Sequence, residues 1–150
     1  MMRLEVMMRL KNLPLSSFPF QTQEHVRYRD TDRQGHVNNT VFGTYFETGR
    51  VRLLYEPNQS FLEGLSTFVV VKITMELLGE IHWPDTVDIG VGILRINATS
   101  LIIGSNLYVR GQIVASSEVT VMHVNAQEKK VEPLPKNLCE KFASYLLLLP

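Results

Sequence analysis

The sequence predicts an α+β fold in which one curved antiparallel sheet wraps around one long helix. Two patterns predict it. Residues 40–56 carry apolar side chains at roughly helical spacing, and the chain after them is rich in segments where apolar and polar residues alternate. Neither the apolar stripe of the helix nor the apolar face of the sheet is covered on its own. Packing the helix against one strongly curved sheet is the simplest arrangement that buries both.

The predicted helix has signals at both ends. Asn38 or Asn39 is expected as its N-cap, because an asparagine side chain accepts hydrogen bonds from the free N–H groups of a first helical turn. Pro57 is expected to end it, because proline disfavours the α conformation in the residue before it. Gly43 and Gly49 lower the intrinsic stability of the helix, so we expect close packing against the sheet there.

The part of the chain before the helix is expected to contain an extension, a strand and a loop. Residues 1–20 are predicted to be an N-terminal extension, either poorly ordered or a short helix, and residues 21–150 to be the main domain. Within that domain the first strand is expected over residues 22–29. The loop that leads to the helix is expected over residues 30–38.

Four antiparallel strands are expected after the helix, followed by a short amphipathic helix over residues 137–149. The strands are predicted over residues 68–78, 87–93, 101–109 and 113–124. A tight hairpin turn at Arg110-Gly111-Gln112 joins the last two. In the first of these strands, strict alternation places five apolar side chains on one face: Val69, Val71, Ile73, Met75 and Leu77.

Composition and charge exclude several classes of function. The 150 residues carry 15 basic and 15 acidic side chains without a block of one sign, so we expect no nucleic-acid or membrane partner. No segment resembles a membrane span or a secretory signal, which favours a cytoplasmic protein. Cys139 is the single cysteine, so no intrachain disulfide is expected. The histidines His25, His82 and His123 lack metal-ligand spacing, so no metal site is expected.

The segment from Asp30 to Asn39 is the most informative part of the chain for function. The carboxylates of Asp30 and Asp32 precede a glycine turn at Gly35, and paired asparagines follow at the predicted helix start. Free backbone N–H groups at the start of a helix can hold a developing negative charge. A base or nucleophile beside such a group of donors is what acyl-transfer chemistry requires.

This segment, together with the order of the elements around it, resembles the hotdog-fold acyl-CoA thioesterases, and within them the 4-hydroxybenzoyl-CoA thioesterase group. The resemblance covers most of the chain and includes residues 68–72, which are similar to the second strand of the family. It implies that Asp32 is the catalytic carboxylate, as nucleophile or as general base, whereas Asp30 fits a local capping role. It implies that the oxyanion is held by backbone of the residues that follow: Gly35, His36, Val37, Asn38 and Asn39.

The same resemblance implies an acyl-CoA substrate and no cofactor. It also implies a homodimer or a dimer-based homotetramer, with each active site built across a subunit interface. Further candidates for contact with the substrate are Tyr45, Thr67, Lys72 and Arg95. His36 is favoured as an orienting or thioester-contacting residue over a general base. Glu47 lies on the predicted helix, where some hotdog subgroups carry a catalytic carboxylate, but pairing with Arg50 is the favoured interpretation.

Two other functions stay open at this point. A hotdog dehydratase acting on hydroxyacyl thioesters would need a histidine and a carboxylate placed differently from those in this chain. A non-catalytic acyl-CoA-binding protein would hold the ligand without releasing thiol. The sequence does not distinguish acyl chain lengths, aromatic from aliphatic acyl groups, or CoA from carrier-protein substrates.

Overall fold

The computed structural model describes residues 3–55 and 66–150. Helix α1 (Arg3–Lys11) comes first, followed by strand β1 (Phe20–His25) and the long helix α2 (Phe42–Tyr55). The remaining elements are β2 (Ser66–Leu77), β3 (Thr86–Ile96), β4 (Ser100–Val109), β5 (Gln112–Asn125), β6 (Lys130–Val131) and α3 (Lys136–Ala143). Single 3₁₀ turns lie at Leu15–Ser17, Tyr28–Asp30 and Asn39–Val41.

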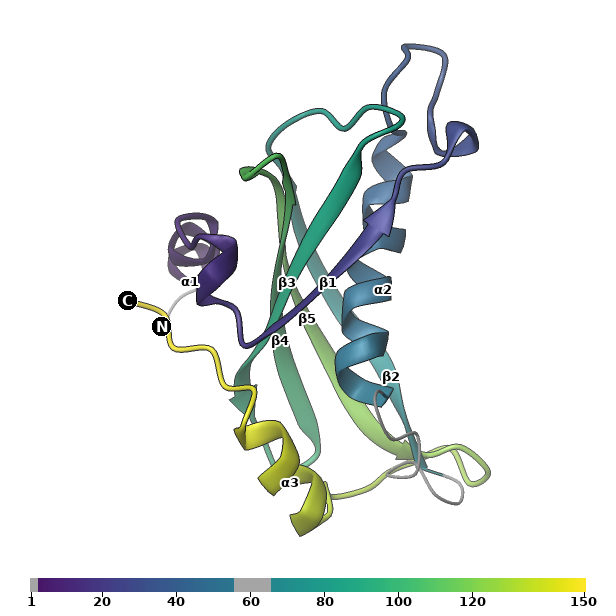
Figure 1. The fold of residues 1–150 in the computed structure, drawn as a ribbon. Helices are drawn as coiled ribbons and strands as arrows, with labels where there is room; N and C mark the ends of the chain where they lie inside the picture. The colour runs from purple at the N-terminus through teal and green to yellow at the C-terminus, as the bar shows by residue number, and fades with distance from the viewer. Residues whose placement is uncertain (1–2, 56–65) are drawn as a thin grey trace.

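The strands form one antiparallel sheet with the order β1–β3–β4–β5–β2, and β6 pairs with β5. Figure 1 shows α2 lying along one face of this curled sheet, which we call the inner face, while α1 lies on the opposite, outer face. The predicted α+β class and the helix wrapped by a curved sheet are therefore confirmed. Among the described residues, no helix has the length and apolar character needed to cross a membrane.

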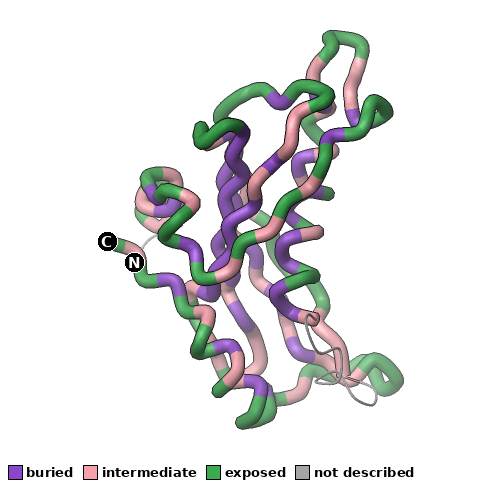
Figure 2. Tube along the Cα trace, in the orientation of Figure 1, coloured by how far each residue is buried: buried purple, intermediate pink, exposed green. Residues whose placement is uncertain are grey.

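The main core lies between α2 and the inner face. The strands contribute alternate residues, so that β3 buries Val87, Ile89, Val91 and Ile93 while the residues between them point outward. Figure 2 shows the resulting band of buried positions along the strands and the sheet-facing side of α2. A Cβ added at Gly49 would lie 2.6 Å from the Ile89 side chain, which confirms the predicted close packing at this glycine. At Gly43 nothing lies within 4 Å, so the expectation was wrong there.

The ends of several elements differ from the predicted ones. Strand β1 is shorter than expected and stops at His25, because residues 28–30 form a 3₁₀ turn. Asn38 is the cap, with its side chain accepting from Thr40 N, and a 3₁₀ turn precedes α2. The expected end of the helix at Pro57 lies outside the described residues. The β4–β5 turn contains two residues, Arg110 and Gly111, both with positive φ, as a tight type I′ hairpin turn requires.

A bulge in β2 contradicts the predicted single apolar face of this strand. The pairing with β5 shifts between Val70 and Lys72. Val69 and Val71 consequently lie on the outer face, where they line a cavity with residues of β5, whereas Ile73 and Met75 face α2. Strict alternation fails here, because one extra residue in a strand moves all the side chains after it to the opposite face of the sheet.

The N-terminal segment is packed against the outer face of the sheet. A second apolar cluster there joins the segment to the sheet and the C-terminal tail: Met7, Leu10, Leu13, Phe18, Tyr108 and Leu147. The buried side chain of Asn106 donates to Leu10 O at 2.8 Å and so satisfies a carbonyl near the end of α1. Of the two expected forms of the extension, the described part is therefore the helix.

The C-terminal helix is shorter than predicted, because the chain leaves α3 at Ala143 and runs along β3. Ile93 and Leu146 form a parallel bridge, and Leu147 N donates to Ile93 O at 2.8 Å. This places the tail beside β3 just beyond the residues that pair with β1. The tail thus packs onto the sheet.

Candidate active site

Asp30 is a buried structural carboxylate. Its Oδ2 accepts hydrogen bonds from Arg27 N at 2.9 Å and from the Tyr45 hydroxyl at 2.8 Å, and Arg27 Nε lies 3.5 Å from Oδ1. Burial alone would raise the pKa of Asp30, but these hydrogen bonds and the charge of Arg27 together hold that pKa below its ordinary value. The ionised Asp30 therefore fixes the start of the loop to α2, in agreement with its expected capping role.

Tyr45 supports Asp30 from the core. Its side chain has no exposed surface, and burial, with the hydrogen bond to Asp30 as a second cause, raises the pKa of its hydroxyl. The hydroxyl therefore remains a donor at any physiological pH. Tyr45 was expected to contact the substrate, but in this chain its side chain has no accessible surface for such a contact.

Asp32 occupies a different environment at the mouth of the turn formed by residues 32–36. Asp32 N donates to His36 O at 2.9 Å and Gly35 N donates to Asp32 O at 3.0 Å, which closes the turn. Gly35 has a φ of +88°, a conformation that favours glycine. The half-buried Asp32 carboxylate accepts at Oδ1 from Gln34 N at 2.8 Å, and in the described chain its Oδ2 has no partner. The hydrogen bond at one oxygen orients the carboxylate, and the other oxygen accepts from no group of the described chain.

The backbone amides between Gly35 and Asn39 are the expected oxyanion donors. Three of these N–H groups already donate within the protein: Gly35 to Asp32 O, Val37 to Ile81 O at 2.7 Å and Asn38 to Asp30 O at 2.9 Å. His36 N and Asn39 N have no acceptor within residues 3–55 and 66–150. Asn39 is the first residue of the 3₁₀ turn that leads into α2, so its amide lies at the positive end of this helical segment.

The loop between β2 and β3 packs against this turn and adds residues that the sequence did not indicate. The rings of His36 and His82 meet edge to face with centroids 6.3 Å apart, and Nε2 of His82 lies 3.2 Å from Glu80 Oε2. The sequence predicted no partner for His36 and no role for His82. Only the contact between two distant loops, through Val37 N and Ile81 O, brings the rings together, so no spacing signal could have revealed it.

A cavity of about 240 Å³ lies between α2 and the part of the inner face formed by β2 and β5. It begins at Thr40 and Gly43, directly after the free Asn39 amide in the chain, and continues along one side of α2. Its walls combine apolar residues with as many polar ones: Phe46, Ile73, Met75 and Val119, with Thr44, Glu47, Arg50 and Ser117. We call this the α2–β2 cavity. It offers both apolar and polar contacts to a ligand.

Arg50 is the buried charge of this cavity. Its side chain is only 9% exposed, and the predicted pairing with Glu47 is present but loose, with Nη2 and Oε2 3.9 Å apart. Burial lowers the pKa of the Arg50 guanidinium, although arginine stays protonated in proteins. Among the described residues, no protein acceptor forms a hydrogen bond with this guanidinium.

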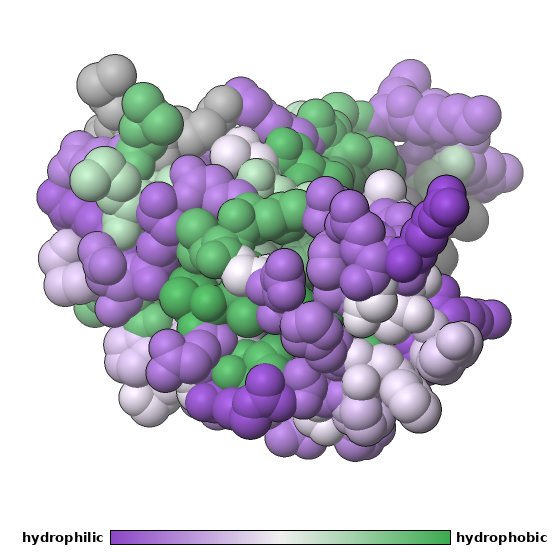
Figure 3. All heavy atoms as spheres, turned by 90° about the horizontal axis from the view of Figure 1, so that it is seen from above, coloured by the Kyte–Doolittle hydropathy of each residue, from purple (hydrophilic) through white to green (hydrophobic). Residues whose placement is uncertain are grey.

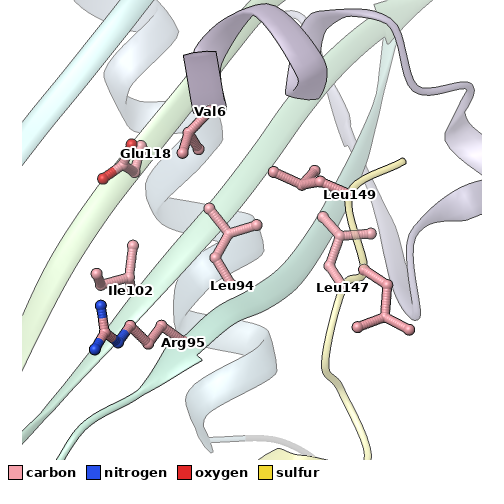
Figure 4. A pocket seen from close by; sticks show the side chains of 8 residues that line it. Val6, Leu94, Arg95, Ile102, Glu118, Leu147 and Leu149 are labelled. Carbon is pink, nitrogen blue, oxygen red and sulfur yellow. The ribbon is translucent and has the colours of Figure 1, made fainter. Parts of the chain in front are cut away.

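The other expected substrate contacts lie on the outer face. Thr67 lines a separate cavity of about 420 Å³ near the start of β2, and the exposed Lys72 pairs in register with Thr120, whose neighbours in β5 face inward. Arg95 lines a third cavity, of about 500 Å³, which Figure 4 shows between α1, the sheet and the C-terminal tail. No described contact joins Thr67, Lys72 or Arg95 to Asp32, so a single chain does not bring these residues to the turn.

The end of the molecule that carries the turn has both hydrophobic and hydrophilic surface. Figure 3, which looks down on this end, shows a patch of hydrophobic side chains bordered by hydrophilic ones. Within the described ranges, no group of three or more His, Cys, Asp or Glu side chains is arranged to hold a metal ion.

Comparison with known proteins shows the family to which the chain belongs. Residues 26–142 match the thioesterase-like superfamily. The acyl-CoA thioester hydrolase YbgC of Escherichia coli O157:H7 and that of Shigella flexneri are each 26% identical to this chain over 127 residues, which is 82% of this chain and 95% of YbgC.

Solved structures are similar over nearly the same length. A thioesterase from Thermus thermophilus, determined with coenzyme A and Zn, is 28% identical with a TM-score of 0.76, over 86% of this chain and 95% of that one. The probable thioesterase YbaW from Escherichia coli is 26% identical with a TM-score of 0.74, over 85% and 98% of the two chains. The chain therefore belongs to the thioesterase-like superfamily and is a hotdog-fold thioester hydrolase.

Proposed function

We propose that this protein hydrolyses acyl-CoA to the free acid and CoA, with Asp32 as the reacting carboxylate. The observation that carries the proposal is the difference in environment between two aspartates. Asp30 is buried, with two hydrogen bonds to Oδ2 and Arg27 beside Oδ1. Asp32 is held through one oxygen, and its other oxygen has no partner in the described chain. Asp32 acts either as a nucleophile on the thioester carbonyl or as a base toward the attacking water.

The amides of Asn39 and His36 are the proposed oxyanion donors. They are the two N–H groups between Gly35 and Asn39 that have no acceptor in the described chain. As the tetrahedral intermediate forms, its oxygen gains negative charge, and preorganised N–H groups stabilise that charge without reorganisation. A thioester is already activated toward attack, so one carboxylate and two donors suffice for the chemistry. Gly35, Val37 and Asn38 would shape the turn that presents them.

The acyl group is proposed to occupy the α2–β2 cavity. Thr40 and Gly43, which follow the proposed oxyanion donors in the chain, line this cavity, and Phe46, Ile73 and Met75 provide apolar walls. Its volume of about 240 Å³ is below the usual range for drug-sized ligands. It suits a short acyl chain or a single ring, since an apolar cavity of about 150 Å³ already accepts benzene.

We propose a second copy of the chain as the partner that completes the site. Strand β2 is at the edge of the sheet and exposes apolar side chains, among them Val69, Val71 and Ile73. An exposed apolar edge strand is a surface for pairing with another strand. Pairing of two β2 strands about a two-fold axis would enclose the α2–β2 cavities between subunits, as a homodimer or as the unit of a dimer-based homotetramer.

The nature of the substrate rests on the relatives. YbgC is named an acyl-CoA thioester hydrolase, and the similar Thermus thermophilus thioesterase was determined with coenzyme A. Transfer of this substrate class to the present chain is supported by the match over the segment that contains the aspartate pair. CoA as the thiol component is therefore part of the proposal.

The test is the substitution Asp32→Asn. We expect kcat for thiol release from short acyl-CoA substrates to fall by about 10²–10⁴-fold, because the variant removes the carboxylate but keeps its shape. The matched control is Asp88→Asn, the same change at a carboxylate on β3 that accepts from Gln23. Activity in the control should stay at the wild-type level.

An Asp32→Asn variant that folds and releases thiol at the wild-type rate would remove Asp32 from the reaction. Tight acyl-CoA binding by the wild-type protein without thiol release would instead favour a non-catalytic binding protein. Formation of an unsaturated acyl-CoA from a 3-hydroxyacyl-CoA would favour a dehydratase.

A further inference from the structure

The α2–β2 cavity contains a buried cation that the proposed hydrolysis does not use. Arg50 lies on α2 two turns beyond the helix start, and 91% of its side-chain surface is removed from water. The guanidinium has five N–H donors in a planar fork. In the described chain, its ion pair is with Glu47 at 3.9 Å, the outer limit of such a pair, and the Glu47 side chain is 65% exposed. Tyr55 is a second and weaker electrostatic neighbour of the guanidinium.

A buried cation with so weak a partner is costly, because desolvation of the guanidinium is not repaid by one loose contact. Proteins rarely retain such a group unless another anion meets it. The other described polar residues that line the cavity do not supply that anion, since Thr40, Thr44 and Ser117 are uncharged. Arg50 is therefore preorganised for an acceptor that comes from outside the described chain.

We propose that Arg50 is a specificity-determining residue that binds a carboxylate at the distal end of the acyl group, so that the preferred substrates are short dicarboxylic acyl-CoA thioesters. This inference rests on the proposed function, because it assumes that the acyl group lies in the α2–β2 cavity. The planar fork of arginine binds a carboxylate through two parallel hydrogen bonds, a geometry that a neutral acyl terminus does not offer.

The arrangement of residues along α2 supports this orientation of the substrate, with the thioester at the helix start and the carboxylate at Arg50. Thr40 and Gly43 line the cavity at the helix start, beside the proposed oxyanion donors, and Arg50 lines it seven residues after Gly43. Phe46 lies between Gly43 and Arg50 on the helix, and Ile73 and Met75 of β2 add apolar side chains to the same cavity. A substrate with a thioester at one end, methylene groups in the middle and a carboxylate at the other matches this sequence of environments. Glu47, being mostly exposed, can turn to solvent when the carboxylate enters.

The experiment compares two acyl-CoA substrates of the same shape and different charge. Adipoyl-CoA carries the distal carboxylate, and 6-methylheptanoyl-CoA carries two methyl groups in place of the two carboxylate oxygens. Thiol release is measured for the wild type, Arg50→Met and Arg50→Lys. Arg52→Met is the matched control, because Arg52 is on the same helix but is exposed and donates to Thr22 Oγ1 of β1.

We expect the wild type to prefer adipoyl-CoA, and Arg50→Met to lower kcat/KM for it by about 10- to 100-fold while the neutral substrate is unaffected or improved. Arg50→Lys should fall between the two, because it keeps the charge and loses the fork. Arg52→Met should resemble the wild type with both substrates. Equal losses on both substrates in Arg50→Met would overturn the inference and indicate a contact to CoA or to the partner subunit. Absence of a wild-type preference for adipoyl-CoA would overturn it as well.

A binding measurement separates this inference from the proposed chemistry. In the Asp32→Asn background, calorimetric titration should show tighter binding of adipoyl-CoA than of 6-methylheptanoyl-CoA, and Arg50→Met should abolish the difference. If the wild type releases no thiol from either substrate while this binding difference persists, the proposed hydrolysis fails and the Arg50 site stands. If thiol release is normal and neither rate nor binding depends on the distal carboxylate, the Arg50 site fails alone.

Discussion

At the scale of single residues, chain geometry gives two aspartates two positions apart opposite environments. The 3₁₀ turn at residues 28–30 directs Asp30 into the protein, where Tyr45 and Arg27 N donate to it. The chain then turns outward, and Asp32 starts the tight turn closed by Gly35. The motif alone allowed a capping and a catalytic aspartate, and the resemblance to thioesterases favoured Asp32 for catalysis. The burial of Asp30 agrees with that order, while the catalytic role of Asp32 stays a prediction.

The buried carboxylate makes a prediction about stability and pH. At neutral pH, Asp30→Asn should lower the free energy of unfolding by about 1–3 kcal/mol, because charged hydrogen bonds to Arg27 N and Tyr45 are lost. The pKa of Asp30 is lower in the folded protein than in the unfolded chain. Its contribution is therefore complete above the unfolded pKa of about 4 and disappears as the pH falls through the folded pKa.

Urea unfolding of the wild type and Asp30→Asn between pH 7 and pH 2.5 checks this prediction. The stability difference should be largest at neutral pH and shrink in acid, whereas Asp88→Asn should show little difference at any pH. A difference for Asp30→Asn that stays constant down to pH 2.5 would mean that the carboxylate is not held in its ionised form.

At the scale of elements, α2 combines two glycines with unequal roles. A side chain at Gly49 would meet Ile89 and Val91 of β3 at 2.6 and 2.9 Å, while Gly43 faces open space beside the α2–β2 cavity. The sequence indicated close packing for both, since a glycine in a helix has the same propensity cost wherever it occurs. Which glycine touches the sheet depends on how the helix is rotated, and that is a property of the packed fold.

Alanine substitutions should separate the two positions. Gly49→Ala should destabilise the protein by about 1–3 kcal/mol, because the buried strand must move to admit a methyl group. Gly43→Ala should stabilise it by about 0.5–1 kcal/mol, because only the helix propensity changes. Thermal unfolding monitored by circular dichroism measures both. Equal effects of the two substitutions would contradict the observed packing of α2 on β3.

The strands show how far periodicity in the sequence leads. The number of β2 to β5 and their antiparallel direction followed from alternation and turn residues, and the apolar stripe located α2 to within a few residues. The position of β2 beside β5 in the sheet was not predicted. The bulge between Val70 and Lys72 was not foreseeable, because an extra residue leaves no mark in an all-apolar run. The two-residue β6 was missed because so short a strand has no pattern.

The candidate site also has features that the sequence predicted and features that it could not. The sequence located the turn and its aspartates, since they form one continuous segment, but it could not show which amides are already bonded. It also could not show that His82 packs on His36, because that contact depends on the path of the β2–β3 loop. The outer-face positions of Thr67, Lys72 and Arg95 depend on strand register and bulges, which residue type does not encode.

At the scale of the whole molecule, the two faces and two edges of the sheet are used differently. The inner face is covered by α2, and part of the outer face by α1 and the C-terminal tail. The β2 edge exposes Val71 and Ile73, with 54% and 57% of their surfaces accessible. This edge is the surface on which the proposed dimer depends.

The substitution Val71→Lys tests the dimer. A lysine on an edge strand opposes pairing with another strand, so we expect a shift from dimer to monomer in sedimentation equilibrium. Thiol release should fall in parallel and recover at high protein concentration, because the site is completed by the partner. Gln23→Lys, at an exposed position on the other edge strand, is the control. A Val71→Lys monomer with full activity would show that one chain is sufficient.

The inequality of these two edges limits how the protein can polymerise. Strand β1 is short, and its exposed positions carry the polar residues Gln21, Gln23 and His25. Strand β2 is long and rich in apolar residues. A subunit with two edge strands that pair readily can add neighbours at both edges and extend into a fibre. A subunit with one such edge strand has no free pairing edge left once it forms a two-fold symmetric dimer. If two β2 edges pair as proposed, we therefore expect association through the strands of this sheet to end at a dimer.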